Sequence, residues 1–480
     1  MTVVVLLAAG RGVRMRSERP KVLHEAAGRP LLDRVLDTAK AVAGRSESVI
    51  VVTSKEDSSK KDSSKEERTV AAHLKANHPG VRIAIQDPPR GTGDAVRAAA
   101  AAGVFGKATT VVVLSGDVPL LSAEAVKGLV DALKKDKKAA VAVLTATLED
   151  PTGYGRVVRD KKKSFVRIRE EKDSSNGERK IREINTGTYA FDRVFLEKAL
   201  PLLTSKNSQS EFYLTDVLSL ARKAGRRVVL VSGDPSSALG VNSRADLARV
   251  DSILRRRNAD AAMAGGATLL HPETITLDEG VALGTDVVVE PFVALLGKTT
   301  VGSGSRIGQG CVVRDTVLGK NVTVKPYCVI ESAVVGDGAI VGPFARLREG
   351  TELAEGVHIG NFVETKKAVL GKGAKANHLT YLGDTEIGER TNVGAGVITC
   401  NYDGFRKHRT TIGRDVFVGS DAQLVAPVTI GDGALIAAGT TVTEDVPPDA
   451  LALSRAPQTN IAAGGAKYRT LRGAGKKTRA

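Results

Sequence analysis

The chain is 480 residues long, more than one hydrophobic core ordinarily serves, so its length favours at least two domains. Its 70 Lys and Arg residues outnumber its 54 Asp and Glu residues, and the formal charge of +16 suits an anionic substrate, a nucleic acid or an acidic membrane surface. A hydrophobic content of 42% argues against wholesale disorder, and the lack of any apolar run of about 18 residues argues against a membrane-spanning helix.

The first 242 residues alternate strand-like and helix-like segments. Short aliphatic runs predict strands, and apolar residues at helical spacing predict helices. The predicted strands are 2–7, 48–53, 81–85, 110–114 and 139–144, and the predicted helices are 31–42, 93–102 and 122–135. This alternation predicts an α/β Rossmann-like domain, with helices on both faces of a parallel sheet and ligands at the carboxyl ends of the strands.

Two polar inserts and one connecting segment interrupt this pattern. The inserts at 54–68 and 161–182 mix Lys, Ser, Asp and Glu, so we expect solvated loops or hairpin tips. Residues 243–264 place Leu247 and Leu254 on one helical stripe, which predicts a linker helix.

A six-residue period begins near residue 265. Glycine is concentrated there, with 18 of the 50 glycines in residues 1–264 and 32 in residues 265–480. Aliphatic residues recur at positions 283, 289, 295, 301, 307 and 313, and later at 412, 418, 424, 430, 436 and 442. This period is typical of a parallel β-helix, in which each aliphatic side chain points inward and glycine lies at the corners. The period breaks at 400–411, where we expect a protruding loop.

The ends of the chain and the cysteines point to the cytoplasm. Met1 leads directly into an apolar strand without a basic leader segment, so secretion is not expected. The cysteines Cys311, Cys328 and Cys400 form no disulfide framework or zinc pattern and suit a reducing compartment. Residues 456–480 are rich in Lys and Arg, and we expect a basic flexible tail.

The N-terminal motifs indicate phosphate chemistry. The Gly-rich turn after the first strand lets backbone N–H groups approach a phosphate, although many α/β turns need glycine for geometry alone. Lys21, held in a Pro-Lys turn, can neutralise triphosphate charge as a point cation. Asp117 follows a predicted strand, where a carboxylate suits Mg²⁺, although it could equally cap a helix.

The motifs L-A-A-G-x-G-x-R-M-x-S-x-x-P-K, G-T-G and G-D-x-P-L together resemble a sugar-nucleotide pyrophosphorylase. Followed by a hexapeptide β-helix, the chain is similar to the bacterial bifunctional N-acetylglucosamine-1-phosphate uridyltransferase/glucosamine-1-phosphate acetyltransferases over about residues 2–458. The resemblance implies a uridyltransferase domain at 1–242, a linker at 243–264, a left-handed β-helix acetyltransferase domain at 265–455 and a tail at 456–480. It also implies UDP-N-acetylglucosamine as the product, for cell-wall and lipopolysaccharide precursors.

For the uridyltransferase site, the resemblance assigns residues to the nucleotide, the sugar and the metal. The UTP-binding residues would be Leu7, Ala8, Ala9, Gly10, Lys21, Gln86, Gly91, Thr92, Ser115, Gly116 and Asp117. The sugar-binding residues would be Gly155, Glu170, Asn185 and Asn242, and Asp117 and Asn242 would bind Mg²⁺. The family often has Tyr where Ser115 stands, so we expect a weaker side-chain contact there.

Cations in the predicted β-helix suggest a second site. Arg348 and Lys366 are eighteen residues apart, which is three hexads, so their side chains are predicted to stack on one face. With Tyr381 and Asn392 they would clamp a sugar phosphate, although solvated surface cations have the same pattern. The resemblance favours the clamp and implies that His378 is the general base that deprotonates the glucosamine amine as it attacks acetyl-CoA.

The resemblance also implies an acetyl-CoA site and an oligomer. Three chains would form a homotrimer in which each acetyl site draws on neighbouring copies. Ser420 and Ala438 are again eighteen residues apart, as a groove along one face requires. The acetyl-CoA-binding residues would be Ala395, Asn401, Tyr402, Ser420, Ala438 and Arg455.

Three alternatives remain at this stage. The first is a pyrophosphorylase for another sugar nucleotide with a structural β-helix, but the set at His378, Tyr381 and Asn401 argues against it. A zinc β-helix enzyme would need clustered His ligands, which the spacing of His358, His378 and His408 does not supply. A nucleic-acid-binding protein would use the positive charge, but the chain lacks aromatic platforms and binding motifs. Small anionic substrates are therefore the expected partners.

Overall fold

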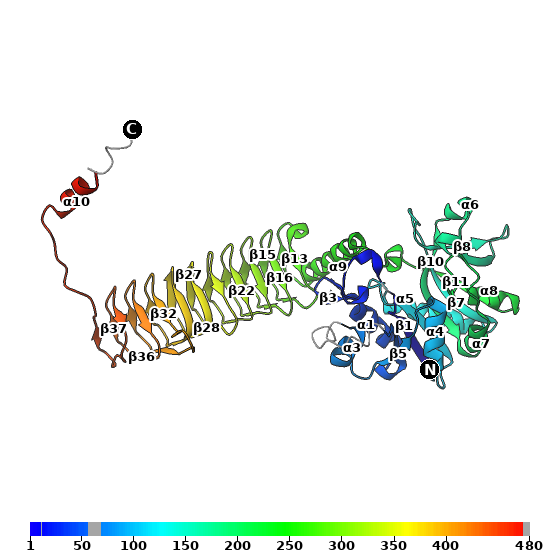
Figure 1. The fold of residues 1–480 in the computed structure, drawn as a ribbon, viewed down its shortest axis with the longest axis horizontal. Helices are drawn as coiled ribbons and strands as arrows, with labels where there is room; N and C mark the ends of the chain where they lie inside the picture. Colours follow the sequence, from blue (N-terminus) through cyan, green and yellow to red (C-terminus); the bar gives the residue numbers. More distant parts are fainter. Residues whose placement is uncertain (11, 56–68, 474–480) are drawn as a thin grey trace. The chain divides into compact units, whose positions relative to one another are not determined.

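The computed structural model describes residues 1–10, 12–55 and 69–473. The chain divides into two compact units, Met1–Asn258 and Ala259–Ala480 (Figure 1). The predicted insert at 54–68 lies largely outside the described residues. Within the described ranges, no helix combines the length and apolar character needed to cross a bilayer.

A central sheet organises the first unit. Its seven main strands run in the order β11, β7, β10, β6, β1, β4, β5, and a further pair, β8 and β9, attaches to β10. The bounds are β1 (Thr2–Leu7), β4 (Val49–Ser54), β5 (Arg82–Gln86), β6 (Thr110–Ser115), β7 (Ala139–Thr147), β8 (Gly155–Arg159), β9 (Phe165–Arg169), β10 (Glu183–Asp192) and β11 (Arg227–Ser232). The five strands predicted from the sequence are all present; β1 has the predicted bounds, and the other four have shifted ends.

The expectation of a parallel sheet is wrong for β10 and for the β8–β9 pair, which the sequence analysis did not predict. β10 lies between β6 and β7 and pairs antiparallel with both. β8 pairs antiparallel with both β9 and β10, and the segment between β9 and β10 holds only short helical turns, so this part of the sheet lacks the long helical crossovers that join parallel neighbours. The sheet is therefore mixed, although β1, β4, β5 and β6 remain parallel neighbours.

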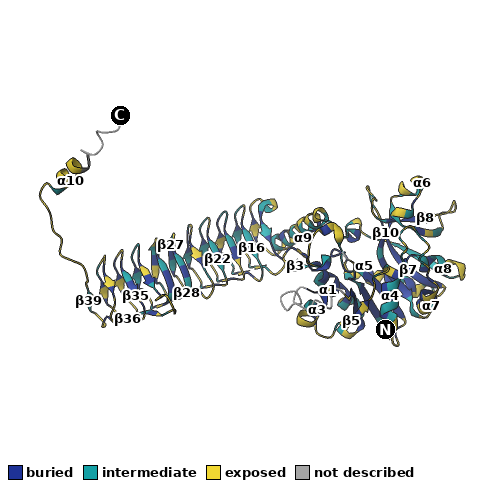
Figure 2. Ribbon diagram, viewed as in Figure 1, coloured by how far each residue is buried: buried dark blue, intermediate teal, exposed yellow. Residues whose placement is uncertain are grey.

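Alternating side chains of the buried strands supply two cores. Val3 and Val5 face a cluster with α4 (Thr92–Ala101) and α8 (Asp216–Lys223), while Val4 and Leu6 face the opposite cluster. That second cluster includes α1 (Leu31–Ala43), α3 (Val70–Asn77) and α5 (Ala123–Lys135). Both faces of the sheet are thus covered, as the buried colour of the strands indicates (Figure 2). The short helix α7 (Arg193–Ala199) follows β10.

The described polar insert at 161–182 contains a hairpin tip, as predicted. β8 and β9 pair antiparallel, and the exposed residues 160–164 connect them. The short helix α6 (Asn176–Arg179) follows, and a capping box between Ser175 and Glu178 fixes its start.

The linker helix α9 runs from Arg244 to Ala264. Val250 and Leu254 join a cluster of the first unit, while Ala259 joins the β-helix core. The predicted stripe therefore serves the first unit, and the last turns of the helix serve the second.

The second unit is a parallel β-helix of short strands from β12 (Thr268–Leu269) to β39 (Leu451–Ala452). One sheet has eleven strands and another seventeen, and partners lie 17 or 18 residues apart along most of their length. The aliphatic residues of the predicted period are buried in one continuous core, apart from a partly exposed Leu283. The hexad prediction is therefore confirmed.

Glycine allows neighbouring coils to approach closely. A Cβ at Gly360 would overlap the carbonyl oxygen of Asn377 on the next coil, and one at Gly302 would lie 2.5 Å from the carbonyl carbon of Gly319. These glycines exclude a side chain at positions where backbones touch, so the glycine excess comes from coil stacking.

Two irregular segments depart from the coils. Residues 401–409 protrude, and an isolated bridge joins Tyr402 to Lys407, as the break in the period predicts. In the tail, residues 464–473 form a helix, α10 (Gly464–Gly473), which the sequence analysis did not predict. Residues 464–473 lack proline and include the helix formers Ala466 and Leu471, which the charge count overlooked.

Candidate active sites

A pocket of about 530 Å³ opens at the carboxyl ends of β1, β5 and β6. Its walls are the Gly-rich turn after β1, the Lys21 turn, the segment between β5 and α4, and the end of β6. Ten of the eleven residues predicted for the nucleotide line it, namely Leu7, Ala8, Ala9, Gly10, Lys21, Gln86, Gly91, Thr92, Ser115 and Asp117. Gly116 does not, because its backbone N–H donates to the carbonyl of Leu7.

Local hydrogen bonds fix the far wall of this pocket. The amide of Gln86 donates to the carbonyl of Gly91 at 3.0 Å and to Asp94 Oδ2 at 2.9 Å. Thr92 Oγ1 accepts from the backbone N–H of Leu214 at 3.1 Å. A Cβ at Gly91 would lie 2.8 Å from the carbonyl oxygen of Phe212, so glycine is required for this approach.

Lys21, Asp117 and Asn242 converge at the mouth of this site. Lys21 Nζ forms a very short ion pair with Asp117 Oδ2 and lies 3.1 Å from Asn242 Oδ1. A carboxylate oxygen and an amide oxygen therefore face one cation, and both are oxygen ligands that Mg²⁺ accepts. The ammonium occupies the position between them, so the donor set fits a bound cation.

A second group of predicted residues gathers beside the β8–β9 hairpin. Gly155 pairs with Asn185 of β10, and a Cβ at Gly155 would lie 3.4 Å from Glu170 Oε2. Burial raises the pKa of the Glu170 carboxyl, which accepts a hydrogen bond from Thr215 Oγ1 at 3.1 Å. Asn185 donates to the hydroxyl of the buried Tyr189 at 2.6 Å. Three of the four predicted sugar residues thus lie together, whereas Asn242 lies with Lys21.

Several lining residues were not predicted. Pro88, Pro89 and Glu211 also line the nucleotide pocket. Glu211 comes from the loop before α8, more than one hundred residues after the turns that it faces, and no motif marks it. The Asp87-Pro88-Pro89 segment next to Gln86 could have predicted a rigid wall of the pocket, because proline stiffens a turn.

In the β-helix, one set of predicted residues lies on three consecutive coils of the seventeen-stranded sheet. Strands β25 (Arg346–Leu347), β28 (Glu364–Leu370) and β30 (Tyr381–Ile387) stack in register, which aligns Arg346, Glu364 and Tyr381. Arg348 pairs with Glu364 at 2.8 Å, and Lys366 lies 3.5 Å from Glu349. The register places the two cations on neighbouring coils, and both have carboxylate partners.

The protruding loop joins this set. Asn401 follows β32 (Ile398–Cys400) and is buried, and its amide lies 2.5 Å from Asp384 Oδ2 and 3.5 Å from the Tyr381 hydroxyl. The ammonium of Lys407 lies over the exposed ring of Tyr402, 4.7 Å from the ring centroid. Asn401 was predicted among the acetyl-CoA residues, but its side chain lies beside Tyr381.

His378 begins a separate row along the end of the eleven-stranded sheet. It ends β29 (Lys375–His378), and the pairing of β29 with β31 (Asn392–Val393) continues to a corner where Ala395 follows. The backbone N–H of Asp421 donates to the Ala395 carbonyl at 2.7 Å, and that of Gly439 donates to the Ser420 carbonyl at 2.8 Å. At the end of this row, Arg455 Nη1 donates a hydrogen bond to the Ala438 carbonyl at 2.6 Å.

The predicted clamp residues come from two sheets. Asn392 lies in β31, in the sheet of His378, whereas Lys366 and Tyr381 lie in the seventeen-stranded sheet and Arg348 directly follows its strand β25. The sequence spacing predicted the position of each residue within its coil. It could not show to which sheet each side of a coil belongs. By sheet, Arg348, Lys366, Tyr381 and Asn401 belong with the seventeen-stranded sheet, and His378 and Asn392 belong with the eleven-stranded sheet.

Comparison with known proteins agrees with this architecture. The MobA-like NTP transferase domain family matches residues 4–185, the GMPPB C-terminal domain family matches residues 270–371, and the bacterial transferase hexapeptide family matches six repeats at 409–444. A putative glucose-1-phosphate thymidylyltransferase structure from Bacillus anthracis covers 53% of this chain and 96% of its own, at 18% identity and a TM-score of 0.41, too low to add to the assignment.

Full-length relatives match almost the whole chain. The bifunctional protein GlmU of Sorangium cellulosum is 47% identical over 456 residues, covering 95% of this chain and 94% of that protein. The bifunctional protein GlmU of an Anaeromyxobacter strain is 50% identical over 457 residues, covering 95% and 90%. The chain therefore belongs to the family of bifunctional GlmU proteins, as an enzyme with a nucleotidyltransferase domain and a hexapeptide acyltransferase domain.

Proposed function

We propose that the chain acetylates glucosamine-1-phosphate with acetyl-CoA in its β-helix and transfers uridylyl from UTP to N-acetylglucosamine-1-phosphate in its first unit, making UDP-N-acetylglucosamine. The observation that carries the second reaction is the convergence of Lys21, Asp117 and Asn242 at a pocket lined by ten residues assigned to the nucleotide. Family membership supports both reactions.

In uridylyl transfer, a phosphate oxygen of the sugar 1-phosphate attacks the α-phosphorus of UTP, and the bond to the β-phosphate breaks to release pyrophosphate. The chain supplies position and positive charge, not covalent catalysis. The turn after β1 orients the nucleotide, while Gly155, Glu170 and Asn185 orient the sugar. Lys21 offsets charge on the triphosphate. Asp117 and Asn242 would hold Mg²⁺, which neutralises phosphate charge when bound.

In acetyl transfer, the glucosamine nitrogen attacks the thioester carbonyl of acetyl-CoA, and the coenzyme A thiolate leaves. His378 takes the proton from the attacking nitrogen, a role that suits an imidazole near neutral pH. Arg348 and Lys366 hold the sugar phosphate with Tyr381 and Asn392. Ala395, Ser420, Ala438 and Arg455 hold the coenzyme along one corner of the coils, and Asn401 and Tyr402 close the site.

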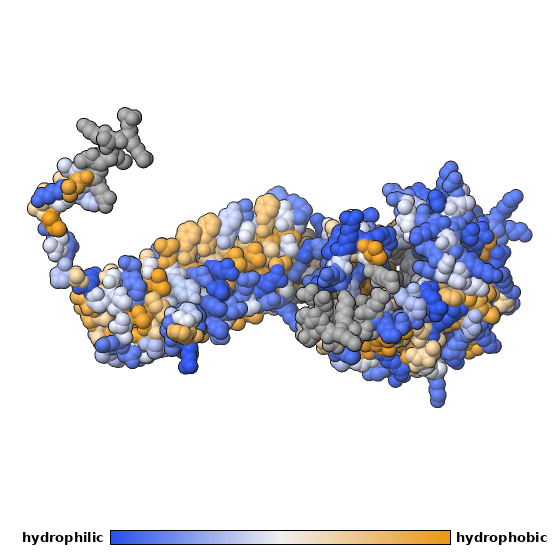
Figure 3. Space-filling view, in the orientation of Figure 1, coloured by the Kyte–Doolittle hydropathy of each residue, from blue (hydrophilic) through white to orange (hydrophobic). Residues whose placement is uncertain are grey.

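We further propose that a homotrimer completes each acetyl site. One chain carries the cationic group and the His378 row on different sheets, so one sheet from each of two copies could supply both halves. Tyr327, Phe344 and Phe362 stack on the β-helix surface with ring centroids 5.3 and 5.4 Å apart, and each is about half exposed. Apolar residues also gather over this unit in Figure 3. Such a surface favours burial by another copy.

The cytoplasm is the proposed location. Cys311 and Cys328 are buried neighbours on adjacent coils, with the Cys328 N–H 3.4 Å from Cys311 Sγ, and both are thiols. A pair of thiols so close together suits a reducing compartment.

The test is an assay of the purified wild-type chain with each substrate pair separately. Glucosamine-1-phosphate with acetyl-CoA should release coenzyme A thiol, and N-acetylglucosamine-1-phosphate with UTP and Mg²⁺ should release pyrophosphate. Glucose-1-phosphate and mannose-1-phosphate serve as matched acceptors. Equal or greater pyrophosphate release with either of them would overturn the sugar assignment, and no thiol release would overturn the acetyl assignment.

A further inference from the structure

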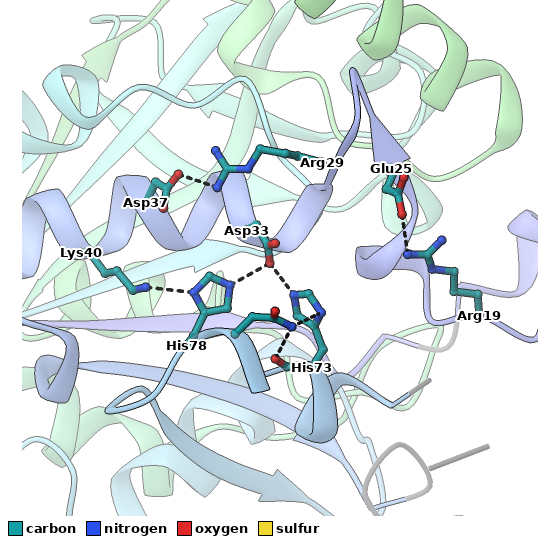
Figure 4. Close-up of polar contacts among 9 residues, drawn as sticks. Arg19, Glu25, Arg29, Asp33, Asp37, Lys40, His73 and His78 are labelled. Atoms are coloured by element: carbon teal, nitrogen blue, oxygen red, sulfur yellow. Dashed lines mark hydrogen bonds and ion pairs between the residues drawn. The ribbon is translucent and has the colours of Figure 1, made fainter. Parts of the chain in front are cut away.

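Two helices of the first unit bring a carboxylate and two imidazoles together, away from both proposed sites. Asp33 lies in the first turn of α1, His73 lies in α3, and His78 directly follows α3. Among the residues that the structure describes, this is the one group of three His, Cys, Asp or Glu side chains whose ligand atoms all lie within 4.8 Å of one another. Figure 4 shows Asp33 between the two imidazole rings.

The geometry of the three side chains is that of converging metal ligands. His73 Nε2 lies 2.6 Å and His78 Nε2 lies 3.0 Å from the same oxygen, Asp33 Oδ1. The three side chains are between 9% and 17% exposed, so little water competes with them. The two histidines hold the pKa of the Asp33 carboxyl well below its usual range despite its burial, so it is ionised.

We propose that Asp33, His73 and His78 bind one divalent transition-metal ion of the Zn²⁺ class, which fastens α3 to α1. Two imidazole nitrogens and one carboxylate oxygen form a ligand set typical of such ions, and water would take the fourth position. Ligand atoms about 2.0 Å from a tetrahedral ion lie about 3.3 Å apart, so the two oxygen–nitrogen distances need to lengthen by only about 0.7 and 0.3 Å.

Binding requires a shift of protons without a net release. Without the ion, each Nε2–H donates to Asp33, and each Nδ1 accepts, from Lys40 Nζ at 2.9 Å on His78 and from the Asn77 amide at 3.3 Å on His73. The ion takes the Nε2 lone pairs, so each ring proton moves to Nδ1. Nδ1–H of His78 can no longer accept from Lys40, and the partly exposed ammonium must turn away. Lys40 therefore disfavours binding of the metal ion.

The effect of Lys40 on metal affinity distinguishes a metal site from a cluster held by hydrogen bonds alone. The probe is Co²⁺, titrated into untagged full-length protein and followed by its visible d–d absorption. Wild type should bind one equivalent with imidazole ligation. Asp33→Asn, which keeps the side-chain shape, and His73→Ala should weaken binding at least about tenfold, whereas Lys40→Ala should strengthen it about tenfold.

His271→Ala, which removes an exposed imidazole beside Glu273, is the matched control and should leave the titration unchanged. Zn²⁺ should also raise the melting temperature of wild type but not that of Asp33→Asn. Uridylyl transfer with Mg²⁺ serves as the folding control, because these residues lie outside the proposed sites. A wild-type spectrum without ligated Co²⁺, equal affinities for wild type and Asp33→Asn, or no gain in Lys40→Ala would overturn the proposal.

Discussion

Lys21 shows how a single residue joins distant segments of this molecule. Its ammonium meets Asp117, 96 residues further along the chain, and Asn242, 221 residues further. Lys21 begins a short 3-10 helix, Asp117 follows β6 and Asn242 precedes α9, so the topology and not the local sequence brings them together. Motif resemblance identified all three, whereas spacing alone left Asp117 as a plausible helix cap.

The Asp33, His73 and His78 cluster marks the limit of sequence reasoning at this scale. No motif surrounds any of the three, and the carboxylate lies 40 and 45 residues before its partners. No pattern in the sequence of α1 or α3 predicts that the polar residues of one helix face the other. Only packing of α1 and α3 on one side of the sheet places them in contact.

Glu170 predicts a pH dependence of stability. Burial raises the pKa of this carboxyl in the folded state, so the folded state disfavours its charged form. The cost appears above the unfolded pKa of about 4.5 and grows until the pH passes the folded pKa. Glu170→Gln should therefore raise the melting temperature, by a margin that increases as the pH rises above about 4.5.

Glu178 supplies a control of opposite sign. Hydrogen bonds from Ser175 and the nearby Arg167 lower the pKa of Glu178 to about 2, so its contribution is present above the unfolded pKa and is lost as the pH falls towards the folded value. Glu178→Gln should lower the melting temperature at pH 8 and less so near pH 4. A melting difference for Glu170→Gln that stays constant with pH would contradict the burial argument.

At the scale of elements, Arg156 anchors the β8–β9 hairpin. Its side chain is 1% exposed, donates to the Tyr154 carbonyl and pairs with Glu171 at 2.7 Å. Arg156→Ala removes a buried ion pair and should lower the free energy of unfolding by about 3 kcal/mol. Arg159 lies on the same hairpin and forms a more exposed ion pair with Glu183 of β10. Arg159→Ala breaks this pair and should lower the free energy of unfolding by about 1 kcal/mol or less. Thermal melts followed by circular dichroism decide, and equal losses would refute the anchoring role.

Coil stacking gives a second prediction at this scale. A Cβ at Gly360 would overlap the Asn377 carbonyl of the next coil, so Gly360→Ala should destabilise the β-helix by about 1 to 3 kcal/mol. Gly128 lies in α5 with no atom near its Cβ position, so Gly128→Ala should stabilise its helix by about 1 kcal/mol. Differential scanning calorimetry of both variants measures the difference. A neutral Gly360→Ala would show that coils can separate without cost.

The elements also show which predictions a repeating pattern supports. The hexads predicted the β-helix because every inward position repeats at a fixed interval, and the buried aliphatic runs predicted five strands of the first unit. The pattern did not predict β8, β9, β10 or β11, and so it could not show that β10 runs antiparallel to its neighbours. It also did not predict α10, because the tail was interpreted from its Lys and Arg content and not from its helix-forming residues.

The whole molecule is two chemistries on one chain, each in a compact unit with its own core. The positive charge that first suggested a nucleic acid includes cations that we assign to small anionic substrates, Lys21 in the first unit and Arg348, Lys366 and Arg455 in the second. Length correctly required more than one domain. A single sequence could not show that the residues predicted for the acetyl site come from two sheets, because that depends on how the coils close.

The central claim is that the two transfers use separate residues in separate units. The most direct measurement assays both reactions in His378→Ala and Asp117→Ala, each checked for an unchanged assembly by light scattering. His378→Ala should lose acetyl transfer at least about hundredfold and retain uridylyl transfer, while Asp117→Ala should do the reverse. Loss of both activities in either correctly assembled variant, or of neither, would contradict the account.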